Sequence, residues 1–231
     1  MALDKLYKLG ARQITRSSLC FDEGVQEIGG PEKVASLSFV TEERPRMEEG
    51  AKVYGRVSEG IVVVSAGYAF NPKPFRAIVP VGLPLLNPKQ ATDENRQGNL
   101  YSVGRGNLQQ VVDRVRLDMT IDEKDVKNNI LEMSLKDFLS KYSKSLFGGQ
   151  GSKEQIEQRV KNAGDYFRRE LDCAGKNKVD SIKLYLPPLD SALEGSAIGT
   201  QIFACGVDYE FDLGGIDGGL HDADGVFGVS D

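Results

Sequence analysis

Short apolar runs of strand length recur along this chain between turn signals, and they constrain its fold more than any other feature. Residues 61–64 (IVVV) are continuous and β-branched, which is typical of a strand buried on both faces. The 26 glycines exceed the average share of about 7% and separate such runs, as turns do in a protein of many strands. The other predicted strands span residues 34–40, 52–57, 75–81, 111–121, 181–186 and 201–211.

One part of the sequence has helical rather than strand periodicity. Asp122 can cap a helix, with Asp125 three residues later as its capping-box partner, and an apolar stripe at helical spacing follows. The glycine-rich residues 147–151 end this helix, and Ser152 with Gln155 begins a second one. Two helices joined by a short loop form an αα-hairpin. We expect six side chains of the two stripes to be buried together: Leu135, Phe138, Leu139, Val160, Phe167 and Leu171.

Together these patterns predict an α+β fold. We expect predominantly antiparallel strands in a sandwich or a barrel-like sheet, with the αα-hairpin inserted at about residues 123–174. Composition divides the chain into three parts. Residues 1–33 are predicted to form an N-terminal arm, residues 34–211 a single β-rich domain that includes the hairpin, and residues 212–231 an acidic C-terminal arm rich in glycine and aspartate.

The lengths of the apolar runs and the spacing of the cysteines bear on the cellular compartment of the chain. No run approaches the roughly 18 residues that a membrane span needs, and the first ten residues lack the apolar core of a signal peptide. Cys20, Cys173 and Cys205 are far apart and form no CxxC pair, so we interpret them as reduced, buried thiols. We therefore expect no membrane span and a place in the cytoplasm or in an intracellular assembly.

The residue types that catalysis and cofactor binding need are poorly placed in this sequence. The one histidine, His221, lies in the glycine-rich tail, and residues 104–107 (GRGN) lack the third glycine of a dinucleotide fingerprint. Asp217, Asp222 and Asp224 are oxygen ligands of the kind calcium prefers, but their spacing does not fit an EF-hand loop. We therefore predict no catalytic residue, no cofactor and no metal.

Charge is unevenly distributed along the chain, which has a net charge of −5. Residues 73–183 hold 20 basic and 15 acidic residues, whereas residues 184–231 hold nine acidic residues and no Lys or Arg. Opposite charges on one surface favour head-to-tail contacts, which close into rings or continue as filaments. We therefore predict a non-enzymatic, self-assembling structural subunit of a homo-oligomer, such as a virion capsid, phage particle, shell or tube. The candidate subunit-contact residues are Asp212, Ile216, Asp217, Leu220, Asp222, Asp224 and Phe227.

Two other classes of function remain open at this point. The first is a nucleic-acid-binding or transport protein that uses the basic middle region 73–183, where Arg105, Arg114 and Arg116 form a candidate phosphate-binding patch. The second is an enzyme with an unrecognised carboxylate or cysteine site. Size-exclusion chromatography would distinguish the assembling subunit from both, and salt-dependent binding to generic DNA or RNA would identify the nucleic-acid-binding protein.

Overall fold

The structure is a computed structural model, and it describes the following residues of the chain: 3–9, 12–17, 19–43, 55–66, 72–79, 87–103, 109–110, 113, 115, 120–143, 145–146, 152–162, 181–192, 197–204, 212–214 and 226–230. Its strands are β1 (Leu3–Leu9), β2 (Arg12–Ser17), β3 (Gly55–Val64), β4 (Phe75–Val79), β5 (Tyr101–Val103), β6 (Val126–Lys127), β7 (Ile130–Ser134), β8 (Ser181–Tyr185), β9 (Ala197–Ala204), β10 (Asp212–Gly214) and β11 (Val226–Ser230). Its helices are α1 (Phe21–Glu27), α2 (Leu37–Glu43), α3 (Pro88–Arg96), α5 (Leu135–Ser143) and a helix over residues 153–162, with short 3₁₀ turns η1 (Pro31–Lys33), η4 (Glu123–Asp125) and η6 (Leu189–Ser191).

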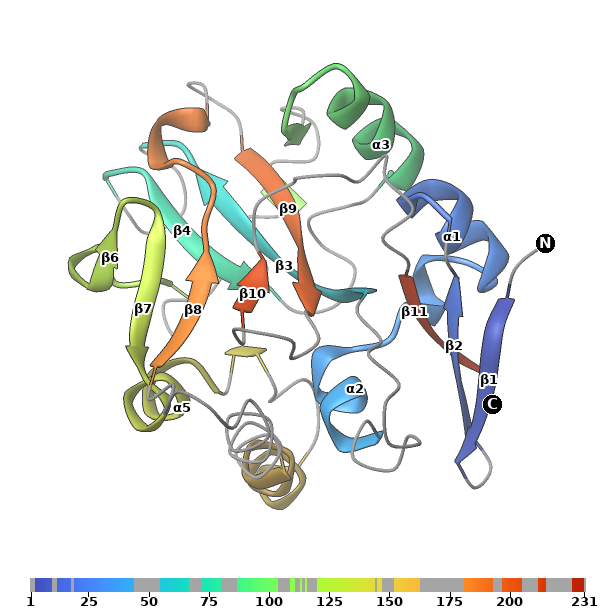
Figure 1. The fold of residues 1–231 in the computed structure, drawn as a ribbon. Coiled ribbons are helices and arrows are strands. Elements are labelled where there is room, and N and C mark those ends of the chain that lie inside the picture. The colour runs from blue at the N-terminus through green and yellow to red at the C-terminus, as the bar shows by residue number, and fades with distance from the viewer. Residues whose placement is uncertain are drawn as a thin grey trace.

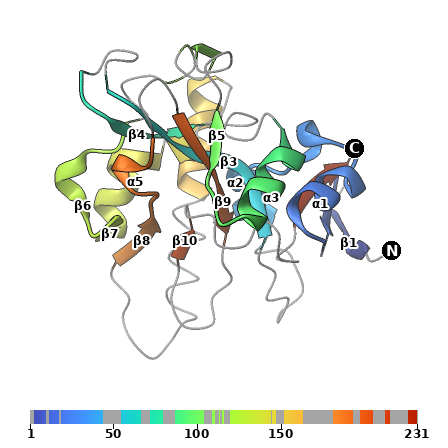
Figure 2. The same ribbon diagram turned by 90° about the horizontal axis from the view of Figure 1, so that it is seen from above.

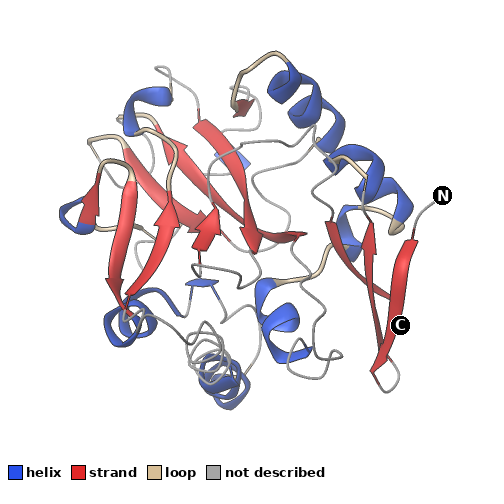
Figure 3. Cartoon of the chain, viewed as in Figure 1, coloured by secondary structure: helices blue, strands red, loops and turns tan. Residues whose placement is uncertain are grey.

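The described strands form one mixed sheet in the order β1-β2-β11-β3-β9-β10-β8-β7-β6, with β4 paired to β3 and β5 paired to β9 (Figure 1). Most neighbours are antiparallel; β11 with β3 and β10 with β8 are parallel. The strands extend from one side of the molecule to the other, and most of the helices lie above and below them in this view (Figure 3). The predicted α+β class with predominantly antiparallel strands is confirmed, and the described strands form no closed barrel.

Strand β3 organises the sheet because it pairs with three other strands. Its first residues lie beside β11, its last five pair with β4, and β9 runs along it. Between Arg56 and Gly60 the register with β9 shifts, since Arg56 faces Phe203 and Gly60 faces Gln201. A bulge of this kind bends a strand and increases its twist. It lies where β3 changes neighbours from β11 to β4.

The core occupies both faces of the central strands. Ile61 packs in a cluster with Leu131, Phe138 and Phe227, whereas Val62 packs in a second cluster with residues that include Phe21 and Tyr101. All four residues of 61–64 are fully buried, which confirms the strand with two buried faces. Helices α1 and α3 lie side by side at the edge of the second cluster (Figure 2).

The first and the last described strands, β1 and β11, belong to this sheet and both pair with β2. β2 pairs with β11, and β11 also lies beside β3, so the first and last described strands are held together (Figure 1). The sheet therefore continues across both predicted domain boundaries, at residues 33 and 211. In particular, residues 226–230 are an internal strand and not part of an extended arm, because each of their edges has a partner in the same chain.

The predicted strand over residues 34–40 is wrong. Only Val34 forms a β-bridge, to Gly228, and α2 begins at Leu37. The Ser36 hydroxyl accepts a hydrogen bond from the Phe39 N–H at 3.2 Å, as a helix N-cap does. Within residues 111–121, predicted as a strand, Asp113 is helical and Thr120 forms an isolated bridge with Ala77.

The helical pair is confirmed, but its first helix starts later than predicted. Asp122 caps only the turn η4, and residues 126–134 form the hairpin of β6 and β7. Helix α5 is capped by Ser134 instead, whose hydroxyl accepts from the Asp137 N–H at 3.1 Å. The predicted capping box of the second helix is present, since Ser152 and Gln155 exchange backbone-to-side-chain hydrogen bonds of 2.9 and 3.3 Å.

The predicted burial of the helical stripes is confirmed in part. Phe138 is fully buried and Leu139 is partly buried against the same cluster. Val160 is half-buried, and the side chains of Leu135, Phe167 and Leu171 lie outside the described residues.

Candidate functional site

A buried arginine joins several connections of the fold. Arg76 is the second residue of β4, a strand whose five residues are all buried, and its side chain is only 2% exposed. A guanidinium cannot lose its charge in a protein, so burial requires polar partners for its N–H groups. The partners of Arg76 come from segments far away in the sequence.

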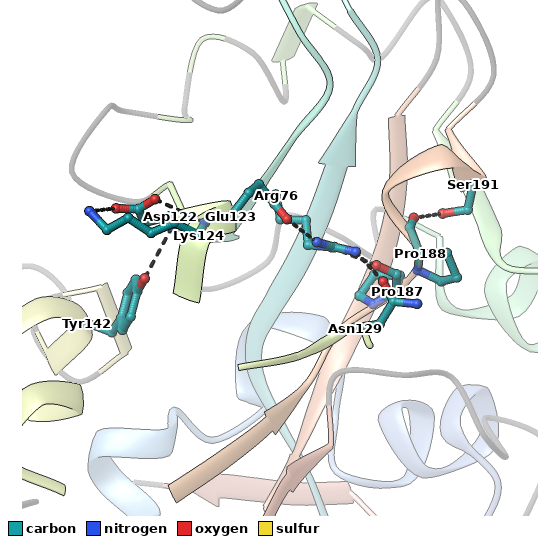
Figure 4. A network of polar contacts seen from close by, with 9 residues as sticks. All are labelled: Arg76, Asp122, Glu123, Lys124, Asn129, Tyr142, Pro187, Pro188 and Ser191. Carbon is teal, nitrogen blue, oxygen red and sulfur yellow. Dashed lines mark hydrogen bonds and ion pairs between the residues drawn. The ribbon is translucent and has the colours of Figure 1, made fainter. Parts of the chain in front are cut away.

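Three acceptors surround the guanidinium (Figure 4). Its Nε donates to the Pro187 carbonyl at 2.8 Å, and its Nη2 donates to Oδ1 of Asn129 at 2.6 Å. Its Nη1 forms an ion pair with Oε2 of Glu123. These acceptors belong to the segment after β8, the β6–β7 turn and the turn η4, respectively. One side chain therefore holds three connections against β4.

Backbone hydrogen bonds reinforce the same arrangement. The Arg76 carbonyl accepts from the Ile121 N–H at 2.9 Å, and the Asn129 carbonyl accepts from the Leu186 N–H at 2.9 Å. The Tyr142 hydroxyl, on α5, accepts from the Asp122 N–H at 3.2 Å (Figure 4). We call Arg76 with Glu123, Asn129 and Pro187 the Arg76 clamp.

The local sequence explains why the β6–β7 turn can reach the clamp. Asn128 and Asn129 have φ values of 52° and 60°, and they connect two antiparallel strands without further residues. A two-residue hairpin turn with two positive φ angles is the type I′ turn, in which asparagine is well tolerated. This turn matches the twist of the strands and presents the Asn129 side chain to Arg76.

Electrostatics in the clamp reflects burial. Burial lowers the pKa of Arg76, and the neighbouring Glu123 opposes that shift. Burial also raises the pKa of Glu123, although Arg76 opposes this. Oε1 of Glu123 is itself buried and has no hydrogen-bond partner in the described part of the chain. The ion pair of Arg76 and Glu123 therefore stabilises the positions of the connections, and this arrangement does not suit proton transfer.

The clamped connections present a polar surface of mixed charge. We call it the clamped surface; its exposed residues are Asp122, Lys124, Lys127, Asn128, Pro188 and Asp190. Lys124 pairs with Asp122 at 2.5 Å, which lowers the pKa of Asp122 and raises that of Lys124. Nearby, Lys141 pairs with Asp125 at 2.6 Å. Such a surface can contact a partner by hydrogen bonds and ion pairs of either sign.

Most of the residues singled out from the sequence are not described by the structure. Arg105, Arg114 and Arg116 lie outside the described residues, and so does His221. Among the predicted subunit-contact residues the same is true of Ile216, Asp217, Leu220, Asp222 and Asp224. Within the described residues, no group of three or more His, Cys, Asp or Glu side chains could hold a metal ion.

The described members of the predicted contact arm belong to the sheet. Asp212 begins β10, where it pairs with Lys183 of β8. Phe227 is 1% exposed and packs in the core of its own chain. The prediction that Phe227 contacts a neighbouring subunit is therefore wrong, because its apolar surface is already buried within the chain.

The interpretation of Cys20 as a buried thiol is confirmed. It is a free cysteine before α1. Its pKa is raised to about 11, mainly by burial and to a smaller extent by its hydrogen bond to Asp22. A thiol with so high a pKa is a weak nucleophile near neutral pH. No helix in the part of the chain that the structure describes is long and apolar enough to cross a bilayer.

Sequence reasoning missed the Arg76 clamp. The available signal was a charged residue inside an apolar strand pattern at residues 75–79, because a buried arginine needs partners. The dipeptide Asn128–Asn129 was a second signal, for a tight hairpin turn. Neither signal shows that Asn129 is a partner of Arg76.

The comparisons with known proteins concern the fold. No protein-family model matches the sequence, and no curated protein matches it. A solved structure described as "Accommodation of massive sequence variation in Nanoarchaeota by the C-type lectin fold" is similar, with a TM-score of 0.61 and 14% sequence identity. The similarity covers 94% of this chain and 95% of that chain. The chain therefore has the architecture of the C-type lectin fold.

Proposed function

We propose that this chain is a non-enzymatic binding protein that recognises a macromolecular partner through connections displayed on a C-type lectin fold. The observation that carries the proposal is the Arg76 clamp, in which one buried side chain of β4 contacts three connections that are far apart in the sequence. Binding residues are often found on loops that a rigid scaffold positions. The clamped surface has this construction.

The similar Nanoarchaeota structure supports a division between scaffold and surface. That structure is described as accommodating massive sequence variation in the C-type lectin fold. Surface side chains can vary when buried contacts hold the backbone, since exposed substitutions cost little stability. In this chain the backbone around the clamped surface is held by Arg76, by the Ile121 N–H and by the Leu186 N–H. Lys124, Lys127 and Asn128 are exposed and do not contribute to the buried contacts described above.

The states of Cys20, Arg76 and Glu123 support binding rather than catalysis. The Cys20 thiol is buried with a raised pKa, and the charges of Arg76 and Glu123 face each other. Mixed charges at a protein surface contribute orientation and specificity more than raw affinity. The partner class that fits best is therefore a protein surface of mixed charge.

A pull-down with matched variants tests this proposal. The full chain would be immobilised and exposed to an extract of the source cells, beside a variant with Lys124→Glu and Lys127→Glu. The control variant has the same charge change on exposed helical positions, Lys89→Glu and Lys153→Glu. We expect a stoichiometric partner to be retained by the wild type and the control, and lost by the first variant. Equal retention by all three, or no specific partner, would contradict the proposal.

A self-assembling subunit, such as a virion or shell component, is the second candidate. It is favoured by the charge segregation between residues 73–183 and 184–231, although the described part of the C-terminal region is committed to the sheet. Sedimentation velocity at several protein and salt concentrations tests it, because association driven by opposite charges weakens with salt. Adding generic DNA to the same samples tests nucleic-acid binding through region 73–183.

A further inference from the structure

A buried carboxyl group lies where the two parts of the sheet meet. Glu59 belongs to the bulge of β3 and is only 4% exposed, and it takes no part in the Arg76 clamp. On one side of the bulge β3 faces β11, and on the other it continues beside β4. Glu59 is therefore placed at the change of neighbours rather than within a regular ladder.

The segment before α2 closes this junction. The Ala35 N–H donates to the Phe227 carbonyl of β11 at 2.8 Å, and the Ser58 N–H donates to the Ala35 carbonyl at 2.8 Å. Val34 forms a β-bridge with Gly228. Residues 34–37 thus connect β11 to the bulge of β3. The Leu37 N–H also donates to the Glu59 carboxyl group. We call these contacts between residues 34–37, β11 and the bulge of β3 the seam.

Glu59 forms the contact of the seam with α2. Its Oε2 accepts from the Leu37 N–H at 2.7 Å and from the Ser58 hydroxyl at 3.3 Å. Leu37 is the first residue of α2, and it is only 1% exposed. The acceptor that fixes the start of α2 is therefore an ionisable group with almost no access to water.

The surroundings of Glu59 provide hydrogen bonds from uncharged groups. Residues 34–37, β9 and β11 contain no ionisable side chain. The other ionisable residues of the neighbouring η1, α2, β4 and of β3 itself are Glu32, Lys33, Glu42, Glu43, Arg76 and Arg56, and Arg76 is paired with Glu123. Burial raises the pKa of Glu59 to about 7. Hydrogen bonds from the Leu37 N–H, from its own N–H and from the Ser58 hydroxyl act in the opposite direction and lower this pKa, but burial has the larger effect. Near neutral pH a small change in pH therefore alters its charge.

We propose that Glu59 is a proton-controlled latch: its neutral form keeps the seam closed, and its ionisation favours local opening of residues 34–43 from the sheet. Among the described residues, the groups that act on Glu59 are uncharged hydrogen-bond donors. A buried carboxylate without a counter-charge is unfavourable, and opening returns it to water. Because the pKa is higher in the closed form, closed protein binds more protons than open protein between about pH 4.5 and 7. Closure is therefore strongest below about pH 4.5, weakens as the pH rises through 7, and changes little above that.

Amide hydrogen exchange tests the latch directly. The probes are the N–H groups of Ala35, Leu37 and Ser58, which donate across the seam, with the Ile121 N–H at the Arg76 clamp as a distant reference. After correction for intrinsic exchange, we expect opening at the three seam probes to increase on the order of 10- to 100-fold from pH 5 to pH 8. The Ile121 N–H should not follow this change.

Two variants and one titration complete the test. Glu59→Gln keeps an acceptor oxygen but cannot ionise, so its seam exchange should be independent of pH. The matched control is Glu132→Gln, an exposed glutamate on β7, which should keep the wild-type profile. A carbon-13 titration of the Glu59 carboxyl group in the wild type should give a pKa near 7.

Several outcomes would overturn the latch. One is a Glu59 pKa near 4.5, the ordinary value of a glutamate. Another is a raised pKa of Glu59 together with amide exchange at the three seam probes that does not depend on pH. The carboxyl group would then titrate without opening the seam. A third is the same pH dependence in Glu59→Gln as in the wild type. If Glu59→Gln does not fold, the wild-type titration and exchange profile decide the question.

Discussion

Arg76 donates a hydrogen bond of 2.6 Å to the side-chain oxygen of Asn129, although 53 residues separate the two along the chain. The same guanidinium donates a hydrogen bond of 2.8 Å to the carbonyl of Pro187, which is 111 residues from Arg76. These contacts join a buried strand, a hairpin turn and the segment after β8. The stability of the connections therefore depends on one side chain that belongs to none of them.

Replacing Arg76 by methionine should destabilise the fold by about 2–4 kcal/mol, because it leaves polar partners without a donor at a site with little access to water. Arg76→Lys should also be destabilising, since one ammonium cannot reproduce a planar fork that serves three acceptors. Urea denaturation monitored by circular dichroism measures both changes. Lys89→Met removes an exposed ion pair with Asp93 and is the control; its unfolding midpoint should not change measurably. Equal midpoints for all three variants would show that the clamp contributes no stability.

Asn128 should tolerate glycine but not valine. Its φ of 52° lies in the left-handed region, which glycine adopts freely and which costs other residues about 1–2 kcal/mol. We therefore expect Asn128→Gly to be close to neutral and Asn128→Val to be destabilising by about that amount, measured by denaturant unfolding. A neutral Asn128→Val would mean that the turn adopts another conformation in solution.

Phe138 is the α5 side chain whose loss should matter most. It is fully buried in the cluster that contains Ile61 and Leu131, and its ring lies 6.0 Å from that of Tyr142. Phe138→Ala should cost about 3–5 kcal/mol in denaturant unfolding, as large-to-small core substitutions do. Lys136→Ala, an exposed change in the same helix, is the control. A loss below about 1 kcal/mol for Phe138→Ala would place this face of α5 outside the core.

Removing β11 should abolish cooperative folding. β11 lies between β2 and β3, and Phe227 fills part of the core, so a chain ending at residue 225 loses an internal strand. We expect this truncated chain to lack a cooperative melting transition, whereas a chain ending at residue 230 should melt like the full chain. Cooperative melting of the shorter chain would mean that β11 is dispensable, as a peripheral arm would be.

Local sequence patterns, which are side-chain periodicity and one capping box, correctly predicted several features. The run at 61–64 predicted a strand with two buried faces, and the stripe through Phe138 predicted a helix with a buried face. Ser152 and Gln155 predicted the start of the following helix. These features depend on neighbours within a few residues, or on which side chains avoid water, and the sequence contains both kinds of information.

Tertiary contacts decided the features that the sequence left open or that were predicted incorrectly. Residues 37–43 are helical because Glu59 and Ser36 satisfy the first N–H groups of α2, and Glu59 lies 22 residues from Leu37. The last strand is internal because β2 and β3 pair with it, and its sequence shows nothing of those partners. Arg76 is buried because Glu123, Asn129 and Pro187 converge on it. Local pattern fixes which residues favour a strand, a helix or burial, whereas hydrogen-bond partners far apart in the sequence are selected only when the chain folds.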